Sequence, residues 1–357
     1  MARPLPRPRT ALAAVLAAML GVTACSGEPQ EPVTPDPVTV SPDIEERRTT
    51  PPEPEVPVVW PLTGVAVEEV PARPAVAVKV ENTSSARPQS GLESADVVWE
   101  TVVEFQVSRL IAVFHSQYPE EVGPIRSVRP MDGPIVAPLK GVLAFSGGQG
   151  GIISDTQATG VQTLSHDAGQ GGMYRVRSRR APHNVYADVA TFAEAADGAH
   201  SAAPAEQFVY ALDAAQATAA VSGTAATSVA FRLSDAARPS WAWDAGSGRW
   251  LRSEGGAAHM GASGSQLSAV NVVAVTAPHP ATRFRAQGGE RVPTYDLVGE
   301  GVALVATGGR TVTGTWRKAA VDVPLQLFTE SGDPLMLAPG NTWVELVPEG
   351  KGSTSVS

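Results

Sequence analysis

Cysteine, histidine and basic residues are all scarce in this sequence. Cys25 is the one cysteine among 357 residues, which excludes an internal disulfide framework and any cysteine-rich metal site. The six histidines lack metal-ligand spacing, and no His-Glu-x-x-His motif occurs, so we expect neither a metal nor another cofactor. Basic residues number 27 against 36 acidic ones, and the formal net charge of −9 argues against a nucleic-acid-binding protein.

Long hydrophobic runs are also missing. The longest run, residues 11–22, follows three arginines and is shorter than the roughly 20 residues that a spanning helix needs. These features predict a secretory signal peptide over residues 1–24. The segment Val22-Thr23-Ala24-Cys25 resembles a bacterial lipobox, in which the cysteine receives diacylglycerol and the mature chain carries acyl groups such as palmitate. The alternative is an ordinary signal peptide with a chance cysteine.

Residues 25–58 are acidic and rich in proline. Residues 26–58 hold eight acidic residues, two basic residues and nine prolines, without apolar periodicity. We therefore expect a lipidated Cys25 followed by a tether that holds the body off the membrane, on the extracytoplasmic face. Lysine accounts for four of the 27 basic residues, and this bias indicates a GC-rich, actinobacterial genome.

The remaining pattern predicts an α+β protein in two parts. Residues 59–200 read as a domain with a mixed α/β-sheet, and residues 201–350 as a mostly β domain built from glycine-linked hairpins. Residues 351–357 are expected to form a disordered tail. The strands expected in the first part cover residues 75–80, 97–103, 110–114 and 141–145, and a short helix is expected over residues 188–196.

A series of ordered motifs resembles the YerB-like bacterial lipoproteins over residues 60–348. The motifs include Pro61-Leu62-Thr63-Gly64, Gly123-Pro124-Ile125-Arg126-Ser127-Val128-Arg129-Pro130, Arg180-Ala181-Pro182-His183-Asn184 and Pro339-Gly340-Asn341-Thr342-Trp343. The resemblance implies a two-part body behind a lipid anchor, and it implies no activity. This chain has Glu104-Phe105-Gln106 where the family usually has a Glu-Gly-Gly turn, which puts in doubt any role of glycine there in close approach to a ligand.

Arginines gather in loop-like segments of the first part, and the guanidinium group suits phosphate or carboxylate. The pattern also resembles, faintly, the LytR-CpsA-Psr enzymes, which hold a polyprenyl pyrophosphate with arginines. The alternative is that the arginines pair with carboxylates such as Asp96, Glu100, Glu104 and Asp132 and fix loops. The candidate ligand-binding residues are Arg87, Gln89, Ser90, Arg109, Arg126, Arg129, Arg180, His183 and Asn184.

Other motifs leave the catalytic residues unknown. Glu100 and Glu104 on one straight strand would lie roughly 13 Å apart, too far for glycoside hydrolysis, so structural pairing is favoured. Residues 147–151 are expected to form either a plain glycine-rich turn or an anion-binding loop. They lack the Lys-Ser/Thr ending of a phosphate-binding loop. His183 with Asn184 binds a ligand or holds a turn. Five of the seven tryptophans lie at or after Trp241 and either stack on sugars or pack a core.

Two functions remain from the sequence. The favoured one is a membrane-anchored binding or scaffold module of the cell envelope, which meets a cell-wall polymer or an envelope protein through an arginine-rich anion site. The alternative is an enzyme acting on an anionic envelope substrate such as a lipid-linked pyrophosphate. Whether the chain is an enzyme stays open. A protein without enzymatic activity is favoured, because the sequence contains no complete set of catalytic residues that can be recognised.

Overall fold

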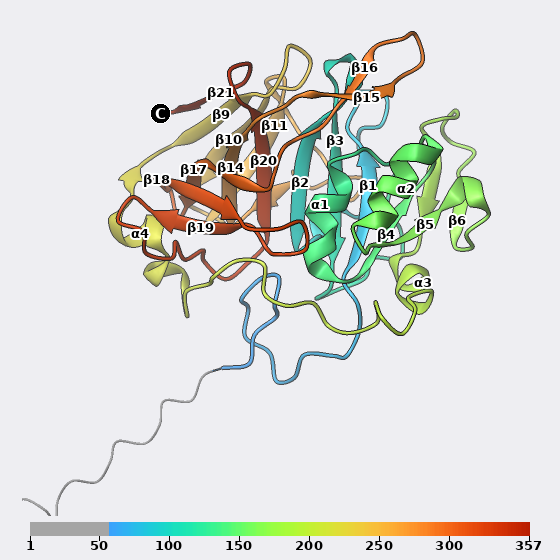
Figure 1. The fold of residues 1–357 in the computed structure, drawn as a ribbon. Helices are drawn as coiled ribbons and strands as arrows, with labels where there is room; N and C mark the ends of the chain where they lie inside the picture. The colour runs from blue at the N-terminus through green and yellow to red at the C-terminus, as the bar shows by residue number, and fades with distance from the viewer. Residues whose placement is uncertain (1–56) are drawn as a thin grey trace, which may run out of the picture. The chain divides into compact units, whose positions relative to one another are not determined.

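Two large sheets, two separate hairpins and a few short helices make up the computed structural model, which describes residues 57–357 (Figure 1). The expected signal peptide, lipidated Cys25 and tether lie outside the described residues, except Pro57 and Val58 of the tether. The described residues belong to one compact unit, and most of their buried apolar side chains form a single cluster. Residues 57–357 therefore contain the elements of a fold that can form without the preceding segment. In this part of the chain no helix is long and apolar enough to cross a membrane.

The large sheet has eleven strands, ten of which follow the order β19-β18-β17-β14-β20-β2-β3-β1-β4-β5. The strands near its centre are apolar runs buried on both faces, which is typical of parallel strands with both faces covered. The ten strands of this order are β1 (Val76–Glu81), β2 (Val97–Val102), β3 (Ser108–Phe114), β4 (Val142–Phe145), β5 (Gln162–Ser165), β14 (Asn271–Ala277), β17 (Gly299–Thr307), β18 (Arg310–Lys318), β19 (Gln326–Thr329) and β20 (Thr342–Pro348). The α+β fold class and the first four expected strands are confirmed.

Most of the central strands run in one direction. Pairing is parallel between β4 and β5, β1 and β4, β2 and β20, and β14 and β20, whereas β3 is antiparallel to both β1 and β2. The carboxyl ends of β1, β2, β4, β5, β14 and β20 therefore meet at one edge of the sheet, which lies at the top of Figure 1. Ligands of open α/β sheets commonly bind at such an edge.

The two halves of the chain share this sheet. Strand β20, from the C-terminal half, pairs in parallel with β2 from the N-terminal half, in the register Val97↔Thr342 to Glu100↔Glu345. After residue 200, where the second part is expected to begin, the chain forms α4 (Thr218–Ser222) and the two-residue strand β8 (Thr224–Ala225), which pairs with β18. A continuous sheet thus joins the two parts, although their sequence patterns differ.

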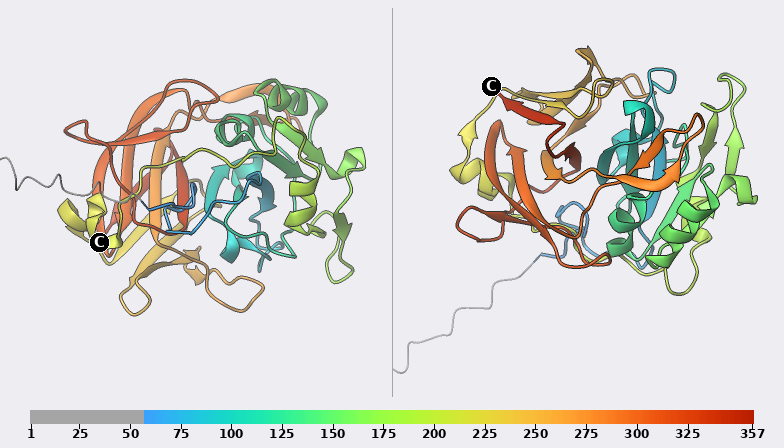
Figure 2. Two further views of the ribbon diagram at one scale, coloured as in Figure 1. Left: turned by 90° about the horizontal axis from the view of Figure 1, so that it is seen from below. Right: turned by 45° about the horizontal axis from the view of Figure 1, so that its top comes forward.

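A second sheet, in the order β12-β11-β10-β9-β21, packs on the first near β14 and β20 (Figure 2). Side chains of β11 alternate between buried and partly exposed, as expected for a strand with one covered face. The bounds are β9 (Ser228–Arg232), β10 (Pro239–Asp244), β11 (Arg249–Glu254), β12 (Ala257–Ala258), β13 (Ser268–Ala269), which pairs with β11, and β21 (Ser353–Val356). The disordered tail expected over residues 351–357 is wrong, because β21 pairs antiparallel with β9 from Ser353↔Arg232 to Val356↔Val229.

Short helices and two hairpins complete the fold. Helix α3 begins after Asp188, whose side chain accepts a hydrogen bond from the Ala190 N–H, as an N-cap does. The α-helices of the N-terminal half are α1 (Asp132–Val136), α2 (Gly150–Ala158) and α3 (Val189–Glu194). The hairpins are β6 (Met173–Arg175) with β7 (Val185–Ala187), and β15 (Ala281–Arg285) with β16 (Arg291–Pro293), and the short helix η3 (Glu104–Gln106) lies beside β16.

Candidate functional site

Strands β1, β2 and β3 carry charged side chains on both faces, inside otherwise apolar runs. Paired residues of neighbouring strands face the same side. The registers Lys79↔Ile111↔Trp99 and Glu81↔Arg109↔Thr101 define one face, and Val80↔Leu110↔Glu100 defines the other. The first face meets α1 and the second meets the second sheet, so two separate polar clusters are built.

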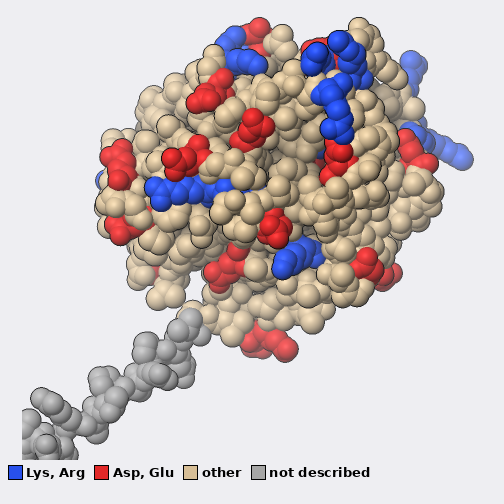
Figure 3. Space-filling view, viewed as in Figure 1, with Lys and Arg blue, Asp and Glu red and all other residues tan. Residues whose placement is uncertain are grey.

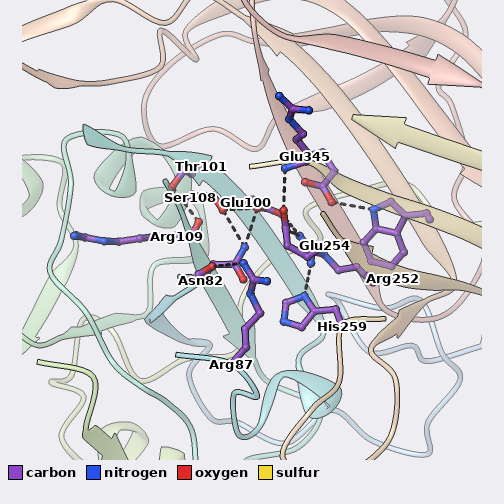
Figure 4. Close-up of polar contacts among 12 residues, drawn as sticks. Asn82, Arg87, Glu100, Thr101, Ser108, Arg109, Arg252, Glu254, His259 and Glu345 are labelled. Carbon is purple, nitrogen blue, oxygen red and sulfur yellow. Dashed lines mark hydrogen bonds and ion pairs between the residues drawn. The ribbon is translucent and has the colours of Figure 1, made fainter. Parts of the chain in front are cut away.

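The cluster towards the second sheet is a closed circuit of hydrogen bonds, and Figure 4 labels four of its five members, Asn82, Glu100, Arg252 and His259. Arg252 donates to His259 Nδ1, and His259 Nε2 donates to Gln89 at 2.8 Å. Gln89 donates to Asn82 at 3.1 Å, and Asn82 donates to Glu100 at 3.0 Å. Arg252 closes the circuit on the other oxygen of Glu100 at 2.5 Å. Burial, together with the nearby Arg252 charge, lowers the pKa of His259 to about 2, so the ring is neutral and can accept at Nδ1.

Glu345 lies beside Glu100 in this buried cluster. Both side chains are fully buried. Burial and the neighbouring Glu100 charge raise the pKa of Glu345 well above its ordinary value. Burial opposes ionisation of Glu100 as well, but the Arg252 charge and the Ser108 hydroxyl hold its pKa below the usual range. With Glu345 protonated, it adds no negative charge beside Arg252, whose Nη2 already contacts the carboxyl oxygens of Glu100 and Glu254 at 2.5 and 2.9 Å.

The cluster towards α1 pairs three cations with two carboxylates. Lys79 donates to Asp132 at 2.7 Å and to Thr101 at 3.1 Å, all three being buried. Burial lowers the pKa of Lys79 to about 8, against the opposing effect of Asp132. Arg129 binds both carboxylate oxygens of Glu104, and the Arg109 guanidinium lies 3.7 Å from the same carboxylate. These ion pairs hold loops against the sheet. This agrees with the alternative given above, in which the arginines pair with carboxylates and fix loops.

A third, partly exposed group surrounds Glu81 at the carboxyl end of β1. His183 Nδ1 lies 2.8 Å from the Glu81 carboxylate, and Thr83 donates to it at 2.7 Å. Arg126 Nε lies 3.4 Å from the same carboxylate. The side chains of His183 and Arg126 are 29% and 21% exposed. A carboxylate that holds one ring nitrogen of a histidine leaves the other nitrogen for a ligand or a proton.

The nine candidate ligand-binding residues are therefore spread over several places. Gln89 belongs to the buried circuit, and Arg87 lies beside it, donating to the Asn82 carbonyl at 2.9 Å. Arg109 and Arg129 lie on Glu104, whereas Arg126 and His183 lie on Glu81. Ser90 donates to Glu121 at 2.8 Å, Asn184 accepts from Arg175 at 2.7 Å across the β6–β7 hairpin, and Arg180 is exposed.

The surroundings of the acid pair, the glycine-rich segment and the tryptophans favour structural roles for all three. Glu104 lies beyond the end of β2, in η3, and binds Arg129, whereas Glu100 binds Arg252, so the two acids do not form a pair. The glycine-rich segment leads into α2, and a Cβ added at Gly147 would lie 2.8 Å from the Asp167 carboxylate, which disfavours an anion there. Four tryptophans of the C-terminal half are buried and pack in the core: Trp241, Trp250, Trp316 and Trp343.

Sequence reasoning missed several members of these clusters. Lys79, Arg252, His259 and Glu345 are all buried, yet none was a candidate. A signal was present for two of them, since Lys79 and Glu345 interrupt residues 76–80 and 343–348, which are otherwise apolar. A charge at the centre of an apolar strand needs a buried partner. The identity of that partner depends on the pairing of strands that are distant in sequence.

Basic side chains are concentrated in the β6–β7 hairpin. Residues 173–183 contain four arginines, one histidine and no acidic residue, in a chain with an excess of acid. Three of the arginines, Arg175, Arg177 and Arg180, are exposed. Within the part of the chain that the structure describes, none of the four is within ion-pair distance of a carboxylate. In Figure 3, basic side chains gather along the upper and right edges of the molecule.

Comparison with known proteins agrees with this architecture. Residues 62–202 match the N-terminal domain, and residues 229–344 the C-terminal domain, of a family described as "Protein of unknown function (DUF3048)". A Bacillus subtilis (strain 168) protein named "Putative lipoprotein YerB" is 54% identical over 70 residues, which cover 19% of this chain and 21% of that protein. The matched segment thus spans about a fifth of that relative's length.

A solved structure extends the likeness to most of the fold. The crystal structure of the YerB protein from Bacillus subtilis superposes with a TM-score of 0.71 at 25% sequence identity, covering 84% of this chain and 99% of that one. The resemblance seen in the sequence motifs is confirmed. By both of its domains, this chain belongs to the DUF3048 family, whose relatives include a Bacillus subtilis protein named as a lipoprotein.

Proposed function

We propose that this chain is an extracytoplasmic lipoprotein, anchored through diacylglycerol on Cys25, whose body binds an anionic polymer of the cell envelope. The observation that carries the binding proposal is the acid-free segment 173–183, with four arginines that face no carboxylate partner among the described residues. Uncompensated guanidinium groups on a protruding hairpin attract phosphate or carboxylate groups. The lipobox-like segment 22–25 and the lipoprotein relative support the anchor.

The hairpin is held rigidly enough to present its charges. Arg175 donates to Asn184 at 2.7 Å across the hairpin, and Arg179 donates to the carbonyls of Ser85 and Pro88 at 2.8 and 2.7 Å. These bonds leave Arg177 and Arg180 as exposed side chains on an anchored loop. A fixed cationic loop loses less conformational entropy on binding a polymer than a mobile one does.

Binding of the fragment 57–357 to poly(glycerol phosphate), measured by calorimetry at low salt, tests the proposal. We expect the double variant Arg177→Gln, Arg180→Gln to bind at least ten-fold more weakly, and wild-type binding to weaken as salt screens the charges. The matched control, Arg238→Gln with Arg317→Gln, removes two exposed arginines elsewhere and should leave affinity unchanged. Equal loss in both double variants, or no loss in the hairpin variant, would refute a specific site on the hairpin.

The anchor has its own test in cells that express the full chain. Lipidation at Cys25 predicts that labelled palmitate is incorporated and that the protein sediments with membranes. The Cys25→Ser variant should lose the label and appear in the soluble extracytoplasmic fraction. A labelled, membrane-bound Cys25→Ser protein would contradict the proposed anchor.

The His183–Glu81 contact favours a second candidate, an enzyme acting on an anionic substrate such as a lipid-linked pyrophosphate. Its geometry suits general base catalysis, with Glu81 orienting the imidazole and Arg126 beside it. Release of phosphate from such a substrate, abolished by His183→Gln and reduced by Glu81→Gln, would support this candidate. Binding without turnover would leave the polymer-binding function alone.

A further inference from the structure

A cavity of about 410 Å³ lies where β2 and β20 end, away from the basic hairpin. Three segments enclose it: η3 after β2, the turn after β9 that contains residues 233–235, and the β15–β16 hairpin. The volume falls within the roughly 300–1,000 Å³ typical of small-molecule sites. Because the sheet's parallel strands end here, the cavity also occupies the edge where such sheets commonly bind ligands.

The lining combines an apolar floor with a charged rim. Arg232, Arg291 and Lys351 supply three positive charges, and Glu104, Asp235 and Glu290 supply three negative ones. Glu104 is bound by Arg129, which does not line the cavity, so the remaining rim has one positive charge in excess. The apolar part of the lining comprises Val102, Val103, Leu233, Ala281, Pro293 and Pro348.

Two of the cations retain unused donors. The ammonium group of Lys351 makes one hydrogen bond, to the His279 carbonyl at 3.1 Å, and the guanidinium group of Arg291 makes one, to the Thr282 carbonyl at 3.3 Å. An ammonium group has three N–H donors and a guanidinium group has five. Arg232, by contrast, is bound to Asp235 at 2.6 Å. The excess charge therefore resides on Lys351 and Arg291, both of which are exposed to solvent.

The walls of the cavity are fixed by contacts that hold a strained segment. Phe105 and Gln106 adopt left-handed backbone conformations, with φ of 61° and 58°. The Phe105 N–H donates to Glu290 on the β15–β16 hairpin at 3.2 Å, and Ser234 donates to the Gln106 carbonyl at 2.5 Å. Backbone strain of this kind persists where the surroundings determine the geometry, often at ligand sites.

From these observations we propose that the cavity binds a small organic anion, with its apolar body on the floor and its charged group between Lys351 and Arg291. The ligand is monovalent because the rim has a single positive charge in excess. The anionic group alone would stay hydrated at the exposed rim. The ligand therefore also needs an apolar portion, which is buried on the floor, where no charged side chain is available as a partner. This site is independent of the polymer-binding hairpin.

Two fluorescent probes of similar shape test the proposal on the fragment 57–357. The first, 8-anilinonaphthalene-1-sulfonate, is a monoanion with an apolar body, and the second, N-phenyl-1-naphthylamine, lacks the charge. We expect one bound molecule of the anion per chain and at least ten-fold weaker binding of the neutral probe. The double variant Lys351→Gln, Arg291→Gln should reduce this preference to three-fold or less.

A blocking variant locates the binding. Ala281 lines the cavity and is exposed, so Ala281→Trp should fill the space and abolish binding of both probes. The control Leu212→Ser removes an apolar side chain that is 72% exposed elsewhere and should leave binding intact. Loss of binding in Leu212→Ser with retention in Ala281→Trp would overturn the site. Equal binding of the two probes to the wild-type fragment would overturn the preference for an anion, and this readout does not depend on any variant folding.

Discussion

Glu100 and Glu345 are neighbours in the parallel register of β2 and β20, and both are fully buried. They come from different halves of the chain: Glu100 lies within the segment that matches the N-terminal domain of the family, and Glu345 directly follows the segment that matches its C-terminal domain. Two ionised carboxylates cannot share a dry site, so one of them keeps its proton. The raised pKa of Glu345 and the lowered pKa of Glu100 assign that proton to Glu345, whereas Glu100 is the carboxylate that binds Arg252.

Replacing Glu345 by glutamine should stabilise the protein at neutral and alkaline pH. In the unfolded chain this carboxyl ionises near its ordinary pKa of 4.5, but the raised pKa in the folded state requires proton uptake on folding. Wild-type stability therefore falls as pH rises above about 4.5, by up to ~1.4 kcal/mol per pH unit, until the folded-state pKa is reached. Glu345→Gln removes this dependence because the amide is neutral in both states.

Urea unfolding between pH 4.5 and 8 measures this effect. The stability difference between Glu345→Gln and wild type should be smallest at pH 4.5 and grow with pH. The control Glu349→Gln alters an exposed carboxyl on the same segment and should give a difference independent of pH. A constant difference for Glu345→Gln would show that Glu345 is ionised in the folded protein.

Removing Arg252 should strongly destabilise the body, by roughly 3–5 kcal/mol, because Glu100 then becomes a buried charge without its partner. Arg252→Met keeps an apolar side chain at this position while removing the guanidinium group, whose central carbon lies 4.9 Å from the Trp343 ring centroid. The double variant Arg252→Met, Glu100→Gln should recover part of the loss, since the uncompensated charge of Glu100 is gone and only Glu254 still lacks its Arg252 contact. Equilibrium unfolding of the three variants forms a double-mutant cycle, and additive losses would contradict direct coupling.

The strands of the N-terminal half could be predicted because most of their residues are apolar and stand in continuous runs. Val76–Glu81 and Ser108–Phe114 are buried throughout, and their composition alone indicates strands covered on both faces. The hairpin around Gly308 and Gly309 follows equally from local turn chemistry, with both glycines at positive φ. These are signals that a short window of sequence contains.

The pairing of β2 with β20 could not be predicted in this way. It joins Val97 to Thr342, residues separated by most of the body, and nothing local in either strand specifies the other. The partners of the buried charges depend on that pairing, so Arg252 could not be assigned to Glu100 from the sequence. The C-terminal strand was missed because Ser353–Val356 is short and polar, and it owes its structure to the free edge of β9.

Replacing Phe105 by glycine should stabilise the folded protein. Its backbone is left-handed at φ of 61°, and its side chain is 56% exposed, so little packing is lost. Removing the Cβ relieves the strain but increases the freedom of the unfolded chain, and the net gain is expected at about 1 kcal/mol. Lys140→Gly, at φ of 49° on an exposed residue, is the matched control and should gain similarly in thermal unfolding. A loss in Phe105→Gly alone would mean that its ring packs against the body.

Deleting residues 353–357 should destabilise the protein, although the segment is polar and terminal. Strand β21 pairs with β9 over four residues, and the Thr227 and Ser228 N–H groups donate to the Ser357 carbonyl at 2.6 and 3.0 Å. Net stabilisation of roughly 0.5–1.5 kcal/mol per hydrogen bond predicts a loss of about 2 kcal/mol or more. Hydrogen exchange provides the sharper measurement. After the deletion, the amides of β9 that donate to β21 should exchange faster. The amides of β14, in the large sheet, should lose only as much protection as the change in global stability accounts for. Unchanged protection along β9 would show that the tail contributes nothing to the sheet.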